Sequence, residues 1–151
     1  MLALSPDVVV IATGGLPQNP PLDAGAELVT SSWDIVAGAV KPAETVLLYD
    51  HNGGHQGMTA AEIASDAGAG VELVSPERFF TPEVGGMNHV PYMRAFHEKG
   101  VRITINTRLV AVRRDGNQLV ATLGSDFATD RRDERRVGQV VVERCRSTIH
   151  I

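Results

Sequence analysis

The stretch "VLLYDHNGGHQGMTAAE", residues 46–62, sets the fold of this chain. An apolar run over 45–49 predicts a strand, a glycine-rich loop follows it, and an alanine-rich segment at about 58–67 has the apolar spacing of a helix packed on a sheet. A second apolar run, "VELVS" at 71–75, predicts the next strand. A strand, a helix and a strand joined this closely predict a right-handed parallel βαβ unit.

The loop of this unit has the glycine spacing of a dinucleotide-binding turn, with one substitution. If Gly57 is the third glycine of that pattern, Gly54 is the second and Asn52 takes the place of the first. The three glycines of such a turn allow the tight bend, the close approach of a pyrophosphate and the packing of helix against strand. Asn tolerates a positive φ better than other non-glycine residues. Asp50 and His51 precede the pattern and are expected to lengthen the turn.

The sequence leaves open whether this loop binds a ligand. Backbone N–H groups at the start of the helix would form an anion site, although His55 and Gln56 could occlude it. In dinucleotide-binding folds an acidic residue after the second strand binds the ribose. Here Glu77 would suit NAD, whereas Arg78 would suit a 2′-phosphate. The alternative is that the loop is only a strand-to-helix turn in a fold that has lost its ligand.

The remaining elements complete an α/β domain. "VVVIA" at 8–12 predicts a buried strand, and a short helix within 30–40 is expected to be capped by Ser31 or Ser32 and ended by Gly38. After the βαβ unit the pattern predicts a long loop over 76–90, a helix over 91–100 with Pro91 in its first turn, and a strand over 101–105. An antiparallel hairpin is expected around Asp115 and Gly116. A polar arm over 125–136 and a closing strand over 137–143 follow it. The sequence therefore predicts a parallel βαβ core with an antiparallel hairpin.

Composition limits the function classes. A chain of 151 residues that is 43% hydrophobic and 21% charged fits one soluble globular domain. Its net charge of -4 gives no general attraction to nucleic acid or to an anionic membrane. No stretch approaches the roughly 20 apolar residues that span a bilayer, and no targeting segment is visible. The single cysteine, Cys145, excludes an internal disulfide or a multi-cysteine metal site and fits a cytoplasmic location.

Other groups that could carry chemistry have structural interpretations. The histidines of the loops and helices do not share one helical face, so no metal site is expected at His51, His55, His89 and His97. Tyr92 and His97 are interpreted as residues of a half-buried helix face, and not as acid–base groups. Cys145 has no identifiable partner base.

A cluster of arginines near the C-terminal end could suggest nucleic-acid binding. It consists of Arg131, Arg132, Arg135 and Arg136. Because Asp133 and Glu134 interrupt it and no aromatic residues are interleaved, it is interpreted as a solvated arm.

Several longer segments resemble one family of flavoproteins. "DVVVIATGG" at 7–15, followed by a proline-containing connector, is similar to the segment that closes the FAD-binding half in flavoproteins with two dinucleotide-binding domains. Three later segments resemble the C-terminal region of NADH:flavin oxidoreductases of the old yellow enzyme type: "VTSSWDIVAGAVKPAETVLLYDHNGGHQGMTAAEIA", "VELVSPERFF" and "GGMNHVPYMRAFHEKGVRITINTRL". That group includes 2,4-dienoyl-CoA reductase, trimethylamine and histamine dehydrogenases, and demethylases of amino acids such as dimethylglycine. The resemblance covers about residues 7–143.

The resemblance implies a division of the chain. Residues 1–41 would be the tail end of an FAD- or ADP-binding half with its connector, 42–143 an NAD(P)-binding-like domain, and 144–151 an atypical C-terminal tail. Full-length members have an N-terminal TIM barrel with FMN and a 4Fe-4S cluster. The chain carries neither that barrel nor its four cysteines. It is therefore expected to be a fragment that is inactive alone, with the barrel and the FAD-binding portion as its partners.

The resemblance also implies a function and a set of site residues. The chain would be the nucleotide-binding portion of a flavin-dependent oxidoreductase, using FAD or ADP and NAD(P)H. The alternative is a non-catalytic module for domain packing or structural ADP binding, and the altered loop suits the trimethylamine dehydrogenase branch, where this half has such a loop and ADP is structural. No catalytic or metal-ligating residue is implied. The expected cofactor-binding residues are Thr13, Gly14, Gly15, Asn52, Gly53, Gly54, Gly57, Met58, Glu77 and Arg78.

Overall fold

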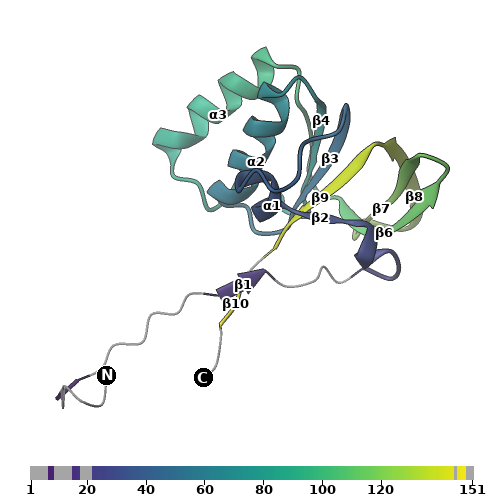
Figure 1. Ribbon diagram of the computed structural model, residues 1–151, viewed down its shortest axis with the longest axis horizontal. Helices are drawn as coiled ribbons and strands as arrows, with labels where there is room; N and C mark the ends of the chain where they lie inside the picture. Colours follow the sequence, from purple (N-terminus) through teal and green to yellow (C-terminus); the bar gives the residue numbers. More distant parts are fainter. Residues whose placement is uncertain (1–6, 9–14, 18–21, 145, 149–151) are drawn as a thin grey trace.

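The structure is a computed structural model, and it describes most of the chain. The described residues are 7–8, 15–17, 22–144 and 146–148 (Figure 1). Most of the strand predicted at 8–12 lies outside them, as do Thr13, Gly14 and Cys145.

A five-stranded parallel sheet forms the centre of the fold, in the spatial order β2-β9-β3-β4-β5. Its strands are β2 (Thr30–Ser31), β3 (Thr45–Asp50), β4 (Gly70–Val74), β5 (Arg102–Thr104) and β9 (Gln139–Glu143). The helix α2 (His55–Asp66) connects β3 to β4, which confirms the predicted βαβ unit. A separate antiparallel sheet contains β6 (Arg108–Asp115), β7 (Gln118–Ser125) and β8 (Ala128–Val137). The predicted α/β class and the hairpin at Asp115 and Gly116 are confirmed.

The elements form three layers (Figure 1). Helices α1 (Ser32–Val36), α2 and α3 (Gly86–Glu98) cover one face of the parallel sheet, and the antiparallel sheet covers the other. Strand β3 serves both cores. Val46 and Leu48 pack with the helices, whereas Leu47 and Tyr49 pack with the antiparallel sheet. Burial on both faces explains why this strand is apolar without alternation.

The turn after β3 is shorter than the sequence predicted. Asp50 belongs to the strand, and the His51 N–H continues the ladder by donating to the Glu143 carbonyl at 3.0 Å. The helix α2 begins at His55, earlier than expected, with Gly54 as its N-cap. The expectation that Asp50 and His51 lengthen the turn is therefore wrong, because both still pair with β9.

Helix α3 begins earlier than its proline suggested. The N–H groups of Asn88 and His89 donate to the Gly85 carbonyl at 2.9 and 3.1 Å, so the helix begins at Gly86. Pro91 lies inside the helix, not in its first turn. A proline there removes one backbone hydrogen bond, which an otherwise continuous helix can tolerate at a cost.

The predicted polar arm is a β-strand. Residues 128–137 form β8 and pair antiparallel with β7. Its exposure alternates towards the C-terminal end, where Asp133 and Arg135 are half-buried and Val137 is buried. An edge strand covered with charges lacks the apolar alternation from which strands are predicted. The expected closing strand is also divided at Gly138, where β8 ends in one sheet and β9 begins in the other.

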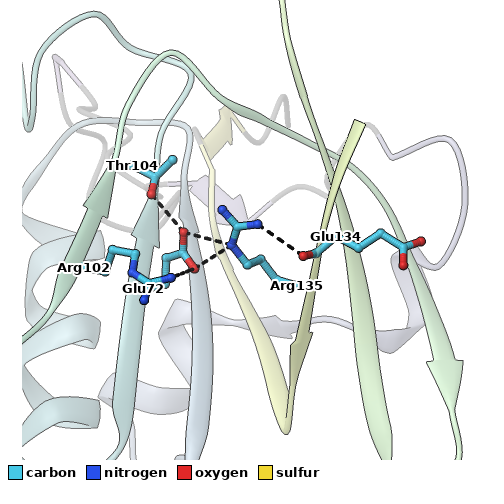
Figure 2. Close-up of polar contacts among 5 residues, drawn as sticks. All are labelled: Glu72, Arg102, Thr104, Glu134 and Arg135. Carbon is cyan, nitrogen blue, oxygen red and sulfur yellow. Dashed lines mark hydrogen bonds and ion pairs between the residues drawn. The ribbon is translucent and has the colours of Figure 1, made fainter. Parts of the chain in front are cut away.

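Arg135 joins the two sheets (Figure 2). The prediction that the arginine cluster is a solvated arm is therefore wrong for Arg135. Its Nε donates to the buried Glu72 carboxylate on β4 at 3.0 Å. The same carboxylate accepts from the Thr104 hydroxyl at 2.9 Å and lies 3.6 Å from the Arg102 guanidinium. Glu72 therefore connects β4, β5 and β8.

The segment before β3 contacts both cores. Ser31 caps α1 by accepting the Trp33 N–H at 3.2 Å, as one of the two sequence alternatives predicted, and β2 pairs with β9. Further back, the Asp23 N–H donates to the Val110 carbonyl at 2.9 Å. The division of the chain at residue 42 stays a prediction. At the two ends, β1 (Gly15–Pro17) pairs antiparallel with β10 (Arg146–Thr148).

Candidate functional site

The glycine loop lies at the carboxyl edge of the parallel sheet. It connects Asp50, the last residue of β3, to His55, the first residue of α2. Strand β3 has β4 on one side and β9 on the other, so the chain leaves β3 where the order of strands reverses. In open α/β sheets ligands bind at this kind of crevice. The turn therefore has the position of a nucleotide site, and Asn52, Gly53, Gly54 and Gly57 come together there.

The side chain of Asp50 fills the inside of the turn. Its Oδ1 atom accepts the Asn52 N–H at 3.0 Å and the Gly53 N–H at 2.9 Å. Its carboxyl group also lies against Gly57, where an added Cβ would be 2.8 Å from the Asp50 Cγ. Gly57 is thus required for contact with this carboxyl group, in addition to the packing of helix on strand.

Burial makes Asp50 a weaker acid than an ordinary aspartate. Its side chain is 1% exposed, and the loss of hydration raises its pKa to about 6. The two N–H groups of the turn lower the pKa, whereas the negative charges of Glu143 and Glu77 raise it further. Inside the loop, the Asp50 carboxyl group therefore accepts the N–H groups of Asn52 and Gly53.

The outer side of Gly53 is covered by a distant segment. Gly53 has φ +67°, and a Cβ added there would lie 2.7 Å from the Pro82 Cδ. The Glu83 N–H donates to the Gly53 carbonyl at 3.1 Å, which holds this segment on the turn. Gly53 is therefore needed for its backbone conformation and for the contact with Pro82.

The second glycine of the pattern is also enclosed. An added Cβ at Gly54 would lie 2.9 Å from Gln56 Oε1 and 3.5 Å from Asn52 Nδ2. Both Gly53 and Gly54 are buried. The spaces that Gly53 and Gly54 open are occupied by side chains of the same chain. Cofactor binding at these residues stays a prediction.

The structure brings Glu77 to the loop but leaves Arg78 exposed. Glu77 is half-buried in the turn after β4, where its N–H donates to Ser75 Oγ at 3.2 Å and its carbonyl accepts the Asn106 N–H at 3.0 Å. Its charge acts on Asp50 and His51. Arg78 is exposed. The choice between a ribose hydroxyl and a 2′-phosphate therefore stays open.

Two of the other expected cofactor residues are described by the structure. The Met58 side chain is 0% exposed and belongs to the core between the sheet and the helices. Gly15 lies in β1, paired with Thr148. A direct contact between Met58 and a cofactor would require this core to open.

Sequence reasoning missed a second buried carboxylate, Glu143. It ends β9, is 3% exposed and pairs in register with Asp50. It accepts a hydrogen bond from the buried hydroxyl of Ser32 at the start of α1. The sequence signal for the pair of Asp50 and Glu143 is that each is an acidic residue at the end of an apolar strand, β3 and β9. No sequence signal identified Pro82, which reaches the loop from far along the chain.

A groove of about 440 Å³ lies beside the loop, between α1 and α2. Its lining is Ser32, Trp33, Val36, Ala37, His55, Gln56 and Thr59. His55 is exposed, and its Nδ1 lies 3.2 Å from the Tyr92 hydroxyl. Tyr92 is half-buried and contacts α2, as its assignment to a half-buried helix face predicted. His97 is exposed, so the same expectation is wrong for His97.

The structure gives two further findings about the described residues. No group of three or more His, Cys, Asp or Glu side chains among them is arranged to hold a metal ion. Within the same part of the chain, no helix has both the length and the apolar character needed to cross a membrane.

Known proteins with similar sequences belong to a dinucleotide-binding family, which agrees with the glycine loop at the carboxyl edge of the parallel sheet. Residues 3–142 match the pyridine nucleotide-disulphide oxidoreductase family. The chain is 50% identical over 140 residues to a probable N-methylproline demethylase of Rhizobium meliloti, covering 93% of this chain and 20% of that protein. It is 42% identical over 147 residues to an N,N-dimethylglycine/sarcosine dehydrogenase of Chromohalobacter salexigens, covering 93% of this chain and 21% of that protein.

A solved structure shows the same fold. The 2-naphthoyl-CoA reductase superposes with a TM-score of 0.76 at 25% identity, over 93% of this chain and 20% of that one. The chain spans about one fifth of the length of these relatives. The resemblance to old-yellow-enzyme-type flavoproteins is confirmed, and domains of the matched family bind FAD and NAD(P). The chain therefore belongs to the pyridine nucleotide-disulphide oxidoreductase family and has the Rossmann-like fold of its dinucleotide-binding domain.

Proposed function

We propose that this chain serves as the nucleotide-binding portion of a flavin-dependent oxidoreductase that removes methyl groups from N-methylated amino acids. The observation that carries this proposal is the 50% identity to an N-methylproline demethylase along nearly the whole chain. The parallel sheet with a glycine loop at its carboxyl edge supports it. In such an enzyme the cofactors supply the redox chemistry, and the protein supplies binding and orientation.

The remainder of such an enzyme would supply what this chain does not contain. A barrel would hold FMN and the 4Fe-4S cluster, and the FAD- or ADP-binding half would include residues 1–41 as its tail end and connector. These portions are the proposed partners, with a dinucleotide as the ligand and the cytoplasm as the location. Nucleic acid and membranes are not proposed as partners, because the net charge of -4 gives neither an attraction.

The test is to express this chain together with the coding sequence that flanks it in its genome. We expect a flavin-containing protein whose absorbance bleaches anaerobically on addition of N-methylproline or dimethylglycine, with proline as the unmethylated control. If NAD(P)H bleaches the flavin and no methylated amino acid does, the enzyme is a reductase and the demethylase proposal is wrong.

A second candidate function is a non-catalytic domain that contributes packing or holds ADP structurally. The filled glycine loop favours it, since Asp50 and Pro82 occupy the inside and outside of the turn. Calorimetric titration of the chain with NADH, NADPH, ADP and FAD separates the two candidates. Saturable heat with NADH or NADPH supports a hydride-accepting domain. Heat with ADP alone supports the second function. The absence of heat with every nucleotide at millimolar concentration supports it too.

A further inference from the structure

We propose that the Asp50 carboxylate is the resident anion of the glycine loop, and that its charge excludes a dinucleotide's pyrophosphate from this turn. The inference does not rest on the demethylase proposal, and it favours the second candidate function, in which this loop binds no NAD(P)H. It names one residue that sets which ligands the loop accepts.

The N–H donors of the turn already have an acceptor. A glycine loop binds phosphate because successive backbone N–H groups point at the anion. Here the N–H groups of Asn52 and Gly53 point at Asp50 Oδ1 instead, at 3.0 and 2.9 Å. Such N–H groups two and three residues after an aspartate are the donors that its side chain takes in a local turn. The acceptor that these two donors need comes from the same chain.

The space on both sides of the turn is also occupied. The third glycine of a dinucleotide turn brings the helix close to the strand. In this chain the Asp50 carboxyl group lies in that close contact, within 3.1 Å of the position of a Gly57 Cβ for each of its oxygens. From the other side Pro82 lies against Gly53. A pyrophosphate would therefore meet a carboxylate below the turn and a proline ring above it.

The charged side chains that act on the turn are negative. The N-terminal end of α2, a helix of 12 residues, has a positive potential that favours one anion beside it. Asp50 lies at that end, and the charged groups that act on it are Glu143 on β9 and Glu77 after β4, both negative. A pyrophosphate would bring further negative charge to three carboxyl groups. Like charges at short range inside a protein repel strongly, so the ionised Asp50 opposes this ligand.

The experiment compares the affinity of variants for two anionic probes, ADP and inorganic pyrophosphate, near pH 7.5. Asp50→Asn keeps an oxygen acceptor for the Asn52 and Gly53 N–H groups and removes the charge. Asp66→Asn is the matched control, because it removes one carboxylate from the far end of the same helix. A parallel series carries Pro82→Gly, which opens the outer side of Gly53. Circular dichroism confirms that each variant is folded.

We expect Asp50→Asn to bind both probes at least about tenfold more tightly than the wild-type chain, with Asp66→Asn unchanged. The gain should appear in the wild-type background, in the Pro82→Gly background, or in both. The proposal is overturned if Asp50→Asn binds no more tightly than its parent in either background. That result would leave the demethylase proposal intact, because the flavin and amine test does not depend on this loop.

A second readout needs no variant and guards against misfolding of Asp50→Asn. The amide proton shifts of Asn52 and Gly53, followed by NMR from about pH 4.5 to 7.5, should move together as Asp50 ionises, because both N–H groups donate to it. Pyrophosphate added to the wild-type chain at the upper pH should leave these two shifts in place. If the shifts ignore the titration, or if pyrophosphate displaces them, Asp50 is not the resident anion.

Discussion

Two buried carboxylates, Asp50 and Glu72, have opposite surroundings, although their strands are neighbours in the parallel sheet. Glu72 accepts a hydrogen bond from Arg135 and lies near a second guanidinium, that of Arg102 (Figure 2). Asp50 accepts two backbone N–H groups and has the negative charges of Glu143 and Glu77 acting on it. A buried carboxylate with a cation joins layers of the fold, whereas one with backbone dipoles and like charges closes a turn and remains costly to ionise.

The largest expected effect is a loss of stability as Asp50 ionises. Its folded pKa of about 6 lies above the ordinary 3.8, so its contribution is fully present below about pH 4 and is lost as pH rises through about 6. Two pKa units correspond to a loss on the order of 3 kcal/mol in the free energy of unfolding. Urea unfolding of the wild-type chain and Asp50→Asn at several pH values measures it as the difference between the two curves. If the two curves are parallel from about pH 4 to 7, the ionisation of Asp50 is not coupled to folding.

The next effect concerns the close contact between α2 and Asp50. Gly57→Ala should cost about 2 kcal/mol, because the new methyl group would overlap the Asp50 carboxyl group and outweigh the higher helix propensity of Ala. The same substitution in an Asp50→Ala background should be neutral or stabilising. Gly86→Ala, at a helical glycine with nothing within 4 Å, is the control and should be close to neutral. Equal costs of Gly57→Ala in both backgrounds would show that Asp50 is not what requires the glycine.

The sequence predicted the parallel core well, for a physical reason. Strands buried on both faces are apolar throughout, and glycines with positive φ end the helices, as Gly68 does after α2. Such signals are local, so β3, α2, β4 and the hairpin were found. The charged strand β8 was missed because it is held by pairing with β7 and by the contact of Arg135 with the buried Glu72, which leave no apolar pattern.

The candidate site was predicted only in part, because its decisive contacts are not local. Asn52, Gly53, Gly54 and Gly57 were placed in one turn from their spacing alone. The contact of Pro82 with Gly53 could not be predicted, since it depends on how the segment after β4 folds back over the turn. Asp50 was visible in the sequence, but its role depends on an orientation inside the turn that spacing does not fix.

A smaller effect is expected at the other carboxylate. Glu72→Ala should cost about 1.5 kcal/mol, because it leaves the partly buried Arg135 and the Thr104 hydroxyl without this acceptor. A double-mutant cycle with Arg135→Ala isolates the pair, and chemical denaturation measures it. A coupling energy near zero would mean that the contact does not help hold the antiparallel sheet to the parallel one.

The smallest effect should come from an ion pair on the outer face of the antiparallel sheet. Arg113 and Glu134 lie 3.3 Å apart, and both side chains are 52% exposed, so solvent screens their attraction. Arg113→Ala should change the free energy of unfolding by less than about 0.5 kcal/mol, and added salt should erase the difference. The contrast with Glu72 follows from burial, since the two pairs share the same chemistry. If Arg113→Ala costs as much as Glu72→Ala, then ion pairing in the antiparallel sheet, and not the buried contact of Glu72, dominates the stability of that layer.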